Sequence, residues 1–409
     1  MLKNTFDFTI VGAGMVGLCV ANQLRKKFPD SKIACIEKEP DVGLHSSGRN
    51  SGILHAGIYY KPDTIKAKVC VKGSRRLKEW IIERKLPLNQ CGKLVIPQRE
   101  ELTSQLLVLH ERAVRNGADV TLVSPDYIKE ICPSANNEVS NALWSPNTAV
   151  TKPIMVVRRL KDELKSSKIK FYFKRRIISW SEETGCLKCD DGLVIHTSYV
   201  FNCAGLYADK VSEIFGIEKE FQMMPFKGLY WQVKNNSALR IPCNLYPVPD
   251  LEMPFLGVHF SPGASKQANV SIGPTATPAL GRENYSWFQG INGMESMRNF
   301  VHLAKLYTQN KGGFKKYVHE QLLLATKPIM IEEAKKLVPN LQWKQVEKSH
   351  KIGIRPQLFD IKNYELVNDF ISRKTGKSYH VLNAISPAFT ASFELADVIL
   401  DNSLAGGAE

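Results

Sequence analysis

Long apolar runs are scarce in this sequence. The uncharged stretch of residues 8–24 comes nearest to the ~20 apolar residues of a membrane-spanning helix. Gly12, Gly14 and Gly17 interrupt it, which argues against both a signal peptide and a membrane span. We therefore expect no transmembrane helix. The lack of a recognisable targeting signal favours the cytoplasm.

Cysteine is also sparse and shows no paired pattern. The nine cysteines are an odd number, and most lie in apolar strings such as residues 17–20 and 34–36. This distribution is typical of buried, reduced thiols. Cys186 and Cys189 form a Cys-x-x-Cys, but the second pair that such a zinc site requires is missing, so we expect no metal.

Acidic residues are too few to balance the basic ones. The chain has 40 Asp and Glu against 55 Lys and Arg, a formal net charge of +15. Such a field attracts anions, whether dicarboxylate metabolites, anionic lipid or nucleic acid. With 44% hydrophobic residues the chain is not disordered, and its 409 residues suggest two or three domains.

The N-terminal region carries a dinucleotide-binding pattern. An apolar, β-rich run at residues 6–11 leads into Gly-Ala-Gly-Met-Val-Gly at 12–17, and helical periodicity follows. A second strand, 32–36, ends in Glu37, about 20 residues after the last glycine. The glycines permit a tight turn and let a pyrophosphate reach the helix N-terminus, while Glu37 suits a ribose hydroxyl.

Two further segments suit the same ligand. Residues 45–57 are rich in small and hydroxylic side chains, which supply N–H and O–H donors beside a flat ring and a pyrophosphate. A strand at 194–202 ends in Cys203-Ala204-Gly205, a second turn open to close backbone approach. Residues 169–180 alternate like a strand. The nucleotide domain is therefore discontinuous, and these patterns leave FAD and NAD both open.

The remainder of the chain has a different pattern. Residues 98–116 have the period of an amphipathic helix, and residues 221–286 form short strand-like runs typical of an antiparallel sheet. Residues 292–339 are helical and basic. That segment suits an anionic membrane surface, although a solvated outer face over a packed inner one is the commoner explanation.

Many unusual strings follow one another in an order that is known from one group of flavoproteins. They lie at residues 45–62, 91–94, 203–209, 225–228, 246–250, 254–260, 272–274, 353–355, 380–384 and 386–388. Through them the chain resembles, over almost its whole length, the D-amino-acid-oxidase-like superfamily. Within that superfamily it resembles the L-2-hydroxyglutarate dehydrogenase/oxidase family.

The resemblance implies an α/β fold of two domains. A discontinuous Rossmann-like FAD domain would comprise residues 1–90, 148–216 and 345–409. An antiparallel-sheet substrate domain with helices would comprise residues 91–147 and 217–344. The implied reaction is oxidation of L-2-hydroxyglutarate to 2-oxoglutarate by hydride transfer from C2 to flavin N5. The electrons would then pass to a quinone or to oxygen.

The matched positions also imply the cofactor contacts. They lie in the glycine turn, after the second strand, in the 45–57 loop, near the distal strands and before the last helix: Gly12, Gly14, Met15, Val16, Gly17, Glu37, Lys38, Ser46, Ser47, Asn50, Ser51, Gly52, Ile177, Ala204, Gly205, Ser386 and Thr390. Residues 386–392 are expected to direct a helix N-terminus at the flavin pyrimidine, which would stabilise the anionic reduced form.

The reaction also needs a group that takes the hydroxyl proton. A neutral imidazole suits this role, and His55 and His259 lie where the resemblance expects the flavin. Both are candidates for base or hydroxyl anchor, and either could instead be a hydrogen-bonded core residue. Tyr60 and Tyr246 are candidate hydrogen-bond donors to substrate, although such tyrosines more often pack.

A dicarboxylate substrate requires two cationic anchors. Arg355, in Gly-Ile-Arg-Pro, looks like the carboxylate-binding arginine of the superfamily, which can bind bidentately. Arg282, Lys227, Lys61 and Arg49 compete for the distal carboxylate and are not ranked. Each could equally contact phosphate or form a surface ion pair.

The exact substrate stays open, because some positions near the expected flavin edge depart from the family pattern: Thr151, Pro356, Ile385, Phe389, Phe393 and Glu394. Another 2-hydroxy acid, an amino acid and glycerol 3-phosphate are alternatives. A non-catalytic flavin scaffold and an RNA-binding flavoprotein are alternatives of other classes. The chain shows no RNA-reading motif, so we expect no nucleic-acid partner. Peripheral contact with the inner membrane stays open.

Overall fold

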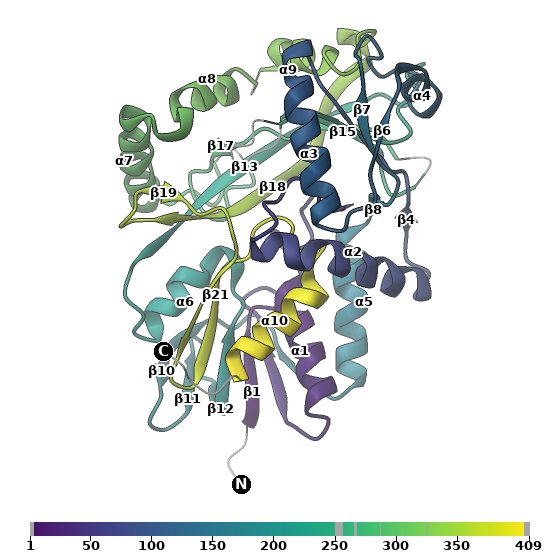
Figure 1. Ribbon diagram of the computed structural model, residues 1–409. Helices are drawn as coiled ribbons and strands as arrows, with labels where there is room; N and C mark the ends of the chain where they lie inside the picture. Colours follow the sequence, from purple (N-terminus) through teal and green to yellow (C-terminus); the bar gives the residue numbers. More distant parts are fainter. Residues whose placement is uncertain (1–3, 250–256, 266–267, 287, 325, 405–409) are drawn as a thin grey trace.

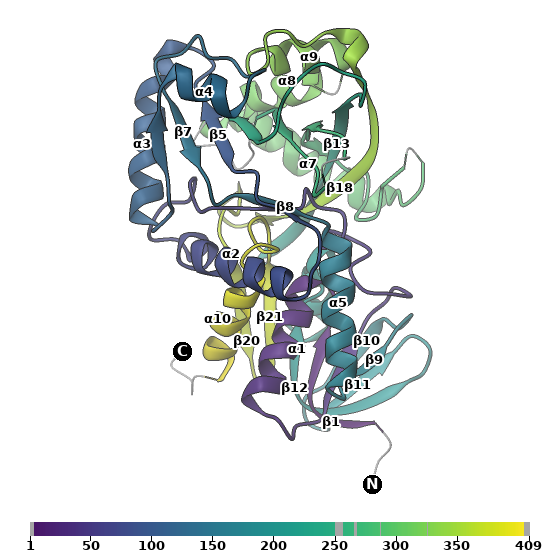
Figure 2. The same ribbon diagram turned by 90° about the vertical axis from the view of Figure 1, so that its right-hand side faces the viewer.

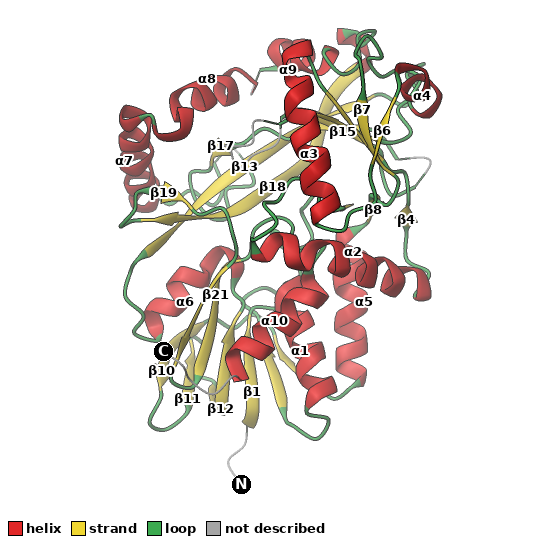
Figure 3. Cartoon of the chain, in the orientation of Figure 1, coloured by secondary structure: helices red, strands yellow, loops and turns green. Residues whose placement is uncertain are grey.

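The computed structural model describes residues 4–249, 257–265, 268–286, 288–324 and 326–404 (Figure 1). Residue 250 and residues 254–256, which belong to two of the family strings, lie outside these ranges. The described residues form an eight-stranded sheet, a ten-stranded sheet and a three-stranded sheet, with helices packed on the two larger ones (Figure 3). The predicted α/β class is confirmed.

The eight-stranded sheet is the nucleotide-binding type. Six of its strands follow the order β10-β11-β12-β1-β2-β9. The other two form a branch, in which β21 pairs with the last residues of β12 and β20 pairs with β21. Its strands are β1 (Thr5–Val11), β2 (Ile33–Ile36), β9 (Lys170–Tyr172), β10 (Ile177–Ser181), β11 (Cys186–Cys189), β12 (Val194–Asn202), β20 (Ile371–Thr375) and β21 (Ser378–Asn383). β1 runs parallel to both β2 and β12, and β12 runs parallel to β21.

Both faces of this sheet are covered, so its central strands are apolar on both sides. Ile10 packs into one core with α1, α2, α5 and α10, whereas its neighbour Val11 packs into another core on the α6 side. Figure 2 shows α1, α5 and α10 along one face of the sheet, with α2 across their upper ends, while α6, labelled in Figure 1, packs into the core of the other face. The helices are α1 (Met15–Lys27), α2 (Ile65–Glu83), α5 (Pro153–Ser166), α6 (Ala208–Ile214) and α10 (Ser392–Leu404).

The ten-stranded sheet is mainly antiparallel and runs β19-β18-β13-β16-β15-β14-β5-β7-β6, with β17 beside β13. Its strands are β5 (Lys93–Ile96), β6 (Thr121–Val123), β7 (Ala142–Ser145), β13 (Phe221–Val233), β14 (Asn244–Pro247), β15 (His259–Ser261), β16 (Ser271–Gly273), β17 (Thr277–Pro278), β18 (Val346–Asp360) and β19 (Glu365–Leu366). The small sheet contains β3 (Ile53–Leu54), β8 (Ala149–Thr151) and β4 (Leu88–Asn89).

The remaining helices include the two helical segments that the sequence predicts outside the nucleotide-binding sheet. They are α3 (Thr103–Arg115), α4 (Pro125–Ile131), α7 (Gly293–Gln309), α8 (Phe314–Leu324) and α9 (Lys327–Lys335), with short 3-10 turns η1 (Glu100–Leu102), η2 (Gly205–Tyr207), η3 (Lys311–Gly313) and η4 (Trp343–Gln345). The helix expected at 98–116 is η1 plus α3, and the segment 292–339 is helical as expected. No helix among the described residues is long and apolar enough to cross a membrane.

Strand β18 lies within the last segment that was expected to belong to the nucleotide domain. Residues 345–409 were assigned to the nucleotide domain, but β18 pairs along almost its full length with β13 of the ten-stranded sheet. The chain therefore enters the nucleotide-binding sheet only with β20 and β21, after β18 and β19. The division into two domains and its boundaries stay predictions.

Candidate active site

The glycine turn after β1 has the tight packing that its spacing predicts. Gly12 has a φ of +101°, and a Cβ there would lie 2.5 Å from the carbonyl oxygen of Cys203. A Cβ on Gly17 would lie 2.0 Å from the carbonyl oxygen of Gly12. Both positions therefore exclude a side chain. Beside them the Met15 amide donates to Ser47 Oγ at 2.8 Å, which ties the start of α1 to the 45–57 loop.

A cleft opens at the edge where the parallel strands β1, β2, β12 and β21 end, the position at which open α/β sheets bind ligands. Ten of the residues expected to hold FAD line it: Gly12, Gly14, Val16, Glu37, Lys38, Ser46, Ser47, Ile177, Ala204 and Gly205. These residues offer the backbone of the glycine turns, the hydroxyls of Ser46 and Ser47 and the carboxylate of Glu37. Apolar side chains of β2 and α6 line the cleft beside them. This donor and acceptor set fits the adenosine diphosphate half of FAD.

Glu37 is held rigidly at the end of β2. Its Oε2 accepts from the Ala13 amide at 2.8 Å and its Oε1 from the Glu39 amide at 2.9 Å. Burial raises the pKa of the Glu37 carboxyl, and the two amides partly offset this effect. Glu37 thus connects the glycine turn to the loop after β2. A carboxylate held in this place could also accept a hydrogen bond from a ribose hydroxyl.

The remaining expected cofactor residues shape the site and lie outside the described lining of the cleft. Asn50 Nδ2 donates to the carbonyl oxygens of Ser46 and Ser47, and its Oδ1 accepts from the Gly52 amide. Thr390 Oγ1 accepts from the His55 amide at 3.2 Å. The group consists of Met15, Gly17, Asn50, Ser51, Gly52, Ser386 and Thr390.

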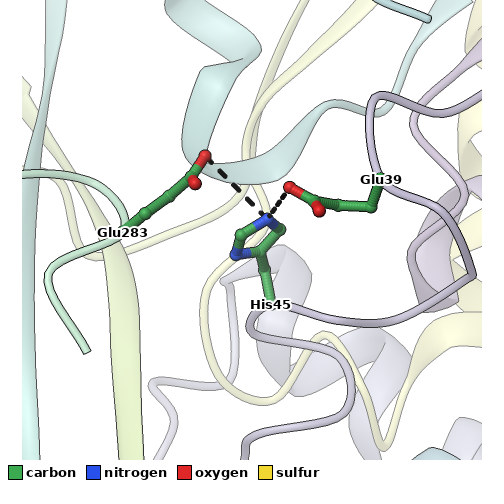
Figure 4. A group of neighbouring side chains, drawn as sticks. All are labelled: Glu39, His45 and Glu283. Atoms are coloured by element: carbon green, nitrogen blue, oxygen red, sulfur yellow. Dashed lines mark hydrogen bonds and ion pairs between the residues drawn. The ribbon is translucent and has the colours of Figure 1, made fainter. Parts of the chain in front are cut away.

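An acidic and basic cluster lies beside the cleft, whose lining includes its members Lys38 and His45, and Figure 4 shows how Glu39 and Glu283 approach His45. His45 Nε2 lies 2.9 Å from Glu39 Oε1 and 4.0 Å from Glu283 Oε1, an arrangement able to hold a metal ion. The Lys38 ammonium, however, pairs with both carboxylates, at 2.6 Å for Glu283. A side-chain cation thus occupies the position of an ion. The cluster links the nucleotide-binding half to the segment around residue 283.

A second group of polar side chains lies where the ten-stranded sheet faces the 45–57 loop. The Tyr246 ring stacks on the His259 ring with centroids 3.9 Å apart, and both residues are buried. His259 interacts electrostatically with Arg355. Burial lowers the pKa of His259 to about 3, so its imidazole is neutral at physiological pH.

His55 joins this group from the opposite half of the molecule. Its Nε2 lies 3.3 Å from Ser386 Oγ, and its Nδ1 has no hydrogen-bond partner among the described residues. Burial lowers the pKa of His55 well below its usual value, and the nearby charge of Lys93 adds to that effect. Tyr60 interacts with Ser386 as well. The structure thus brings together His55, His259, Arg355, Tyr60 and Tyr246, all of which the sequence analysis named.

Lys93 is a residue that the sequence analysis missed. It begins β5, whose four residues are all buried, and its side chain is 0% exposed. Its Nζ lies 4.2 Å from the centroid of the Tyr246 ring and 5.0 Å from that of Tyr59. Burial lowers the pKa of Lys93 to about 7. A lysine at the head of an otherwise apolar strand was the available signal, because such residues are almost never fully buried without a partner.

Arg282 is not a carboxylate anchor for substrate, contrary to one expectation. It is 4% exposed, and its guanidinium is held by the carboxylates of Asp209 and Glu295 and by the carbonyl oxygen of Leu206. The Arg282 Nη2 lies 2.9 Å from Asp209 Oδ2 and 2.6 Å from Glu295 Oε1. Since its donors are already engaged inside the protein, it joins α6 to α7 instead.

The other distal candidates also lie apart from the histidine pair. Lys227 is opposite Ile354 in the β13–β18 register, whereas Arg355 is opposite Phe226, so Lys227 and Arg355 project from opposite faces of the sheet. Lys227 Nζ donates to the Ser286 carbonyl oxygen at 3.0 Å. Lys61 is exposed, and Arg49 is exposed with its guanidinium over the Tyr285 ring.

The chain was compared with known proteins. A sequence model described as FAD dependent oxidoreductase matches residues 7–401. A relative from Caenorhabditis elegans named mitochondrial L-2-hydroxyglutarate dehydrogenase is 32% identical over 98% of this chain and 93% of its own length. A relative from Indibacter alkaliphilus named L-2-hydroxyglutarate dehydrogenase is 30% identical over 98% of this chain and 99% of its own.

Solved structures share the fold at lower identity. L-alpha-glycerophosphate oxidase from Mycoplasma pneumoniae, dithionite-reduced with FAD bound, has a TM-score of 0.76 at 20% identity, covering 98% of this chain and 94% of its own. Glycine oxidase from Geobacillus kaustophilus has a TM-score of 0.71 at 15% identity, covering 98% and 94%. These likenesses confirm the expected architecture. The comparisons give no support to the RNA-binding alternative.

Proposed function

Because this chain belongs to the family of FAD dependent oxidoreductases, and within it to the L-2-hydroxyglutarate dehydrogenases, we propose that it oxidises L-2-hydroxyglutarate to 2-oxoglutarate. FAD is its cofactor, as the sequence analysis expected. The observation that supports this substrate is the meeting of two neutral histidines and an arginine: His259 and Arg355 come from the ten-stranded sheet, and His55 comes from the loop after β3.

The cofactor residues form one side of the proposed site. The adenosine diphosphate of FAD would lie against Gly12, Gly14, Ser46 and Ser47, with its ribose on Glu37. When bound, FAD supplies the acceptor for the hydrogen and electron pair that leave C2 of the substrate. The two halves of the site come from different sheets, so a ligand between them is enclosed by both.

The protein side chains provide binding and proton transfer. Arg355 would bind the carboxylate next to the reacting carbon, which fixes the orientation of C2. His55 and His259 are both held neutral by burial, so either can accept the proton of the substrate hydroxyl. The Nδ1 of His259 is tied to the Gly257 carbonyl oxygen at 2.9 Å, and the Nδ1 of His55 has no partner among the described residues. Because the Gly257 carbonyl oxygen can only accept, His259 Nδ1 is the donor and its Nε2 is left to accept a proton, so both histidines stay candidates for base or hydroxyl anchor.

An anaerobic titration tests the proposal. Purified holoenzyme is mixed with L-2-hydroxyglutarate, and the flavin absorbance is followed without oxygen. We expect full bleaching with one equivalent of 2-oxoglutarate formed, because C2 oxidation transfers two electrons. The D enantiomer, L-2-hydroxybutyrate, glycine and glycerol 3-phosphate are the controls. Bleaching with one of these but not with L-2-hydroxyglutarate would assign a different substrate.

We propose that the electron acceptor is a quinone or oxygen. We also propose that the protein is cytoplasmic and contacts the membrane peripherally. The membrane contact is supported by α7, where Met294, Met297 and Phe300 are 87%, 66% and 68% exposed at helical spacing. The α7–α8 segment also carries Arg298, Lys305 and other cations, so apolar and basic groups occur together as on membrane-surface helices.

Vesicle co-sedimentation tests this contact. Vesicles with 30% anionic phospholipid should retain the protein at low salt, and purely neutral vesicles should retain it weakly. Exchange of Met294 and Phe300 for serine should release it from the anionic vesicles. Equal retention of that variant would remove α7 from the interface, and reoxidation rates with a soluble quinone and with oxygen would separate the two acceptors.

A further inference from the structure

Three buried polar atoms near the histidine pair have no hydrogen-bond partner among the described residues. They are Lys93 Nζ, Tyr59 Oη and His55 Nδ1. Tyr59 and Tyr246 have ring centroids 6.4 Å apart, Lys93 lies over both rings, and its charge acts on His55 and His259. The three atoms therefore belong to one region. Buried groups of this kind normally have partners, so three unpartnered atoms in one region are what a polar ligand-binding pocket leaves open.

Two other lysines of this region, the buried Lys66 and the half-buried Lys351, differ from Lys93 in one respect. Lys351 Nζ donates to the Ser51 carbonyl oxygen at 3.2 Å, and Lys66 has the carboxylate of Asp369 as a nearby counter-charge. The groups that could offset the Lys93 charge are the thiols of Cys70 and Cys91, and burial raises the pKa of both thiols. Neutral thiols do not compensate an ammonium. Lys93 is thus a cation site without an anion.

We propose that Lys93 and Tyr59 form a carboxylate-binding subsite that holds the distal carboxylate of the substrate. The inference rests on the proposed function and adds to it the residue that selects dicarboxylates. Arg355, Lys93 and Lys351 all act electrostatically on His259, and of the two lysines only Lys93 lacks a hydrogen-bond partner among the described residues. A dianion with one carboxylate on Arg355 and the other on Lys93 would have its hydroxyl-bearing carbon near the histidines.

The chemistry of the subsite explains why an unpaired lysine is kept there. A buried ammonium costs free energy unless an anion and hydrogen bonds compensate it. A carboxylate supplies both, since it accepts from the Lys93 ammonium and from the Tyr59 hydroxyl. The two aromatic rings beneath the ammonium stabilise it before substrate arrives. A methyl group in the same place would leave the lysine and the tyrosine unpaired, so monocarboxylates are disfavoured.

The experiment compares two substrates and two inert ligands in the holoenzyme. L-2-hydroxypentanoate equals L-2-hydroxyglutarate except that a methyl group replaces the distal carboxylate. Pentanoate and glutarate are the corresponding non-reacting pair, and their dissociation constants are read from the perturbed flavin spectrum. In the wild type we expect a preference for the dicarboxylate of about 100-fold or more in kcat/KM, as for a charged hydrogen bond. Glutarate should likewise bind more tightly than pentanoate.

Lys93→Met should abolish both preferences, mainly through KM, with FAD content and the visible spectrum retained. Lys93→Arg should restore part of them, and Tyr59→Phe should reduce them by about 5- to 20-fold. Lys66→Met is the matched control, because it removes a neighbouring buried lysine that already has a counter-charge, and it should keep the preference.

The outcomes separate the inference from the proposed function. If Lys93→Met keeps the wild-type preference, or if Lys66→Met is the variant that loses it, the subsite assignment is overturned. If the wild type binds glutarate in a Lys93-dependent way but L-2-hydroxyglutarate does not bleach the flavin, the subsite stands and the proposed substrate fails.

Discussion

Two buried cations of this protein, Arg282 and Lys93, have opposite surroundings. The Arg282 side chain is 3% exposed, and its guanidinium pairs with Asp209 and Glu295. Lys93 is 0% exposed and has no hydrogen-bond partner within the described part of the chain. From sequence, Arg282 was a candidate for substrate binding and Lys93 was not. Burial alone therefore does not mark a functional cation; the absence of an internal anion does.

The physical reason lies in the two electrostatic balances. For Arg282 the carboxylates overcome desolvation and raise the pKa of the guanidinium above its already high value. For Lys93 desolvation is not offset, and it lowers the pKa to about 7. A stabilised cation serves the fold, because removing it strands two carboxylates. A destabilised cation serves a ligand, because binding an anion relieves it.

Replacing each cation by methionine tests this contrast most directly. Arg282→Met should lower the free energy of unfolding by about 3–5 kcal/mol, because it leaves Asp209 and Glu295 buried and unpaired. Thermal unfolding of the holoenzyme should show a decrease in Tm of roughly 4–6 °C. Lys93→Met should change Tm by less than about 1 °C or raise it, since an apolar chain replaces an unpaired charge.

The reverse pattern, a large loss of stability for Lys93→Met and none for Arg282→Met, would contradict the division into a structural and a ligand-binding cation. Arg282→Lys serves as the control for charge. It should recover only part of the stability, because an ammonium cannot reproduce the bidentate contact with Asp209.

Arg355 provides a third cation for the comparison. It is assigned to the carboxylate beside C2, so Arg355→Ala should lower kcat/KM for L-2-hydroxyglutarate by about 100- to 1000-fold and affect both KM and kcat. FAD occupancy should be unchanged, since the residue belongs to the ten-stranded sheet and not to the glycine turn. Wild-type kinetics in this variant would remove Arg355 from the site.

The contrast also explains which parts of the molecule the sequence could predict. The nucleotide half was readable because its chemistry is local: Gly12, Gly17 and Glu37 stand at fixed spacing along one βαβ unit, and backbone sterics dictate glycine. The resemblance to a known family then supplied His55, His259 and Arg355, which local periodicity could not have joined.

The misassigned cations show the limit of that approach. Whether Arg282 meets carboxylates or a ligand depends on the packing of α6 against α7, and the sequence contains no local record of that contact. The face of Lys227 follows from the register of β13 on β18. The surroundings of Lys93 depend on the pairing of β5 with β14, a strand more than a hundred residues further along the chain, and of β14 with β15. Pairing across such distances is a property of the fold.

The pH dependence gives a smaller effect that sharpens the contrast. Because the pKa of Lys93 in the free enzyme is lowered to about 7, its cation predominates below pH 7, is half lost at about pH 7 and is lost progressively as pH rises further. The kcat/KM for L-2-hydroxyglutarate should therefore fall towards tenfold per pH unit above pH 7. Lys93→Arg should move this limb beyond pH 9, because the guanidinium keeps its proton.

Neighbouring groups set the control for this profile. Of the described groups facing Lys93, the two histidines have lowered pKa values, and Cys70, Cys91, Tyr59 and Tyr246 have raised ones. Lys66 and Lys351, however, have pKa values lowered to about 8. L-2-hydroxypentanoate has no distal carboxylate to bind Lys93, so its kcat/KM responds to the ionisation of Lys66 and Lys351 only. Its pH profile should therefore lack the fall that begins at pH 7. If kcat/KM falls above pH 7 with both substrates, the fall belongs to a group other than Lys93.

Neutralising one partner of Arg282 gives the smallest expected effect. Glu295→Gln keeps an oxygen that can accept from the guanidinium and leaves Asp209 Oδ1 and Oδ2 in place, so the free energy of unfolding should fall by only about 1 kcal/mol. Asp209→Asn removes the bidentate acceptor and should cost about three times as much. Thermal unfolding of the two variants, with FAD saturating, measures the ratio. Equal losses would mean that the charge balance is shared evenly, and that Arg282 responds to total negative charge more than to the fork geometry that Asp209 provides.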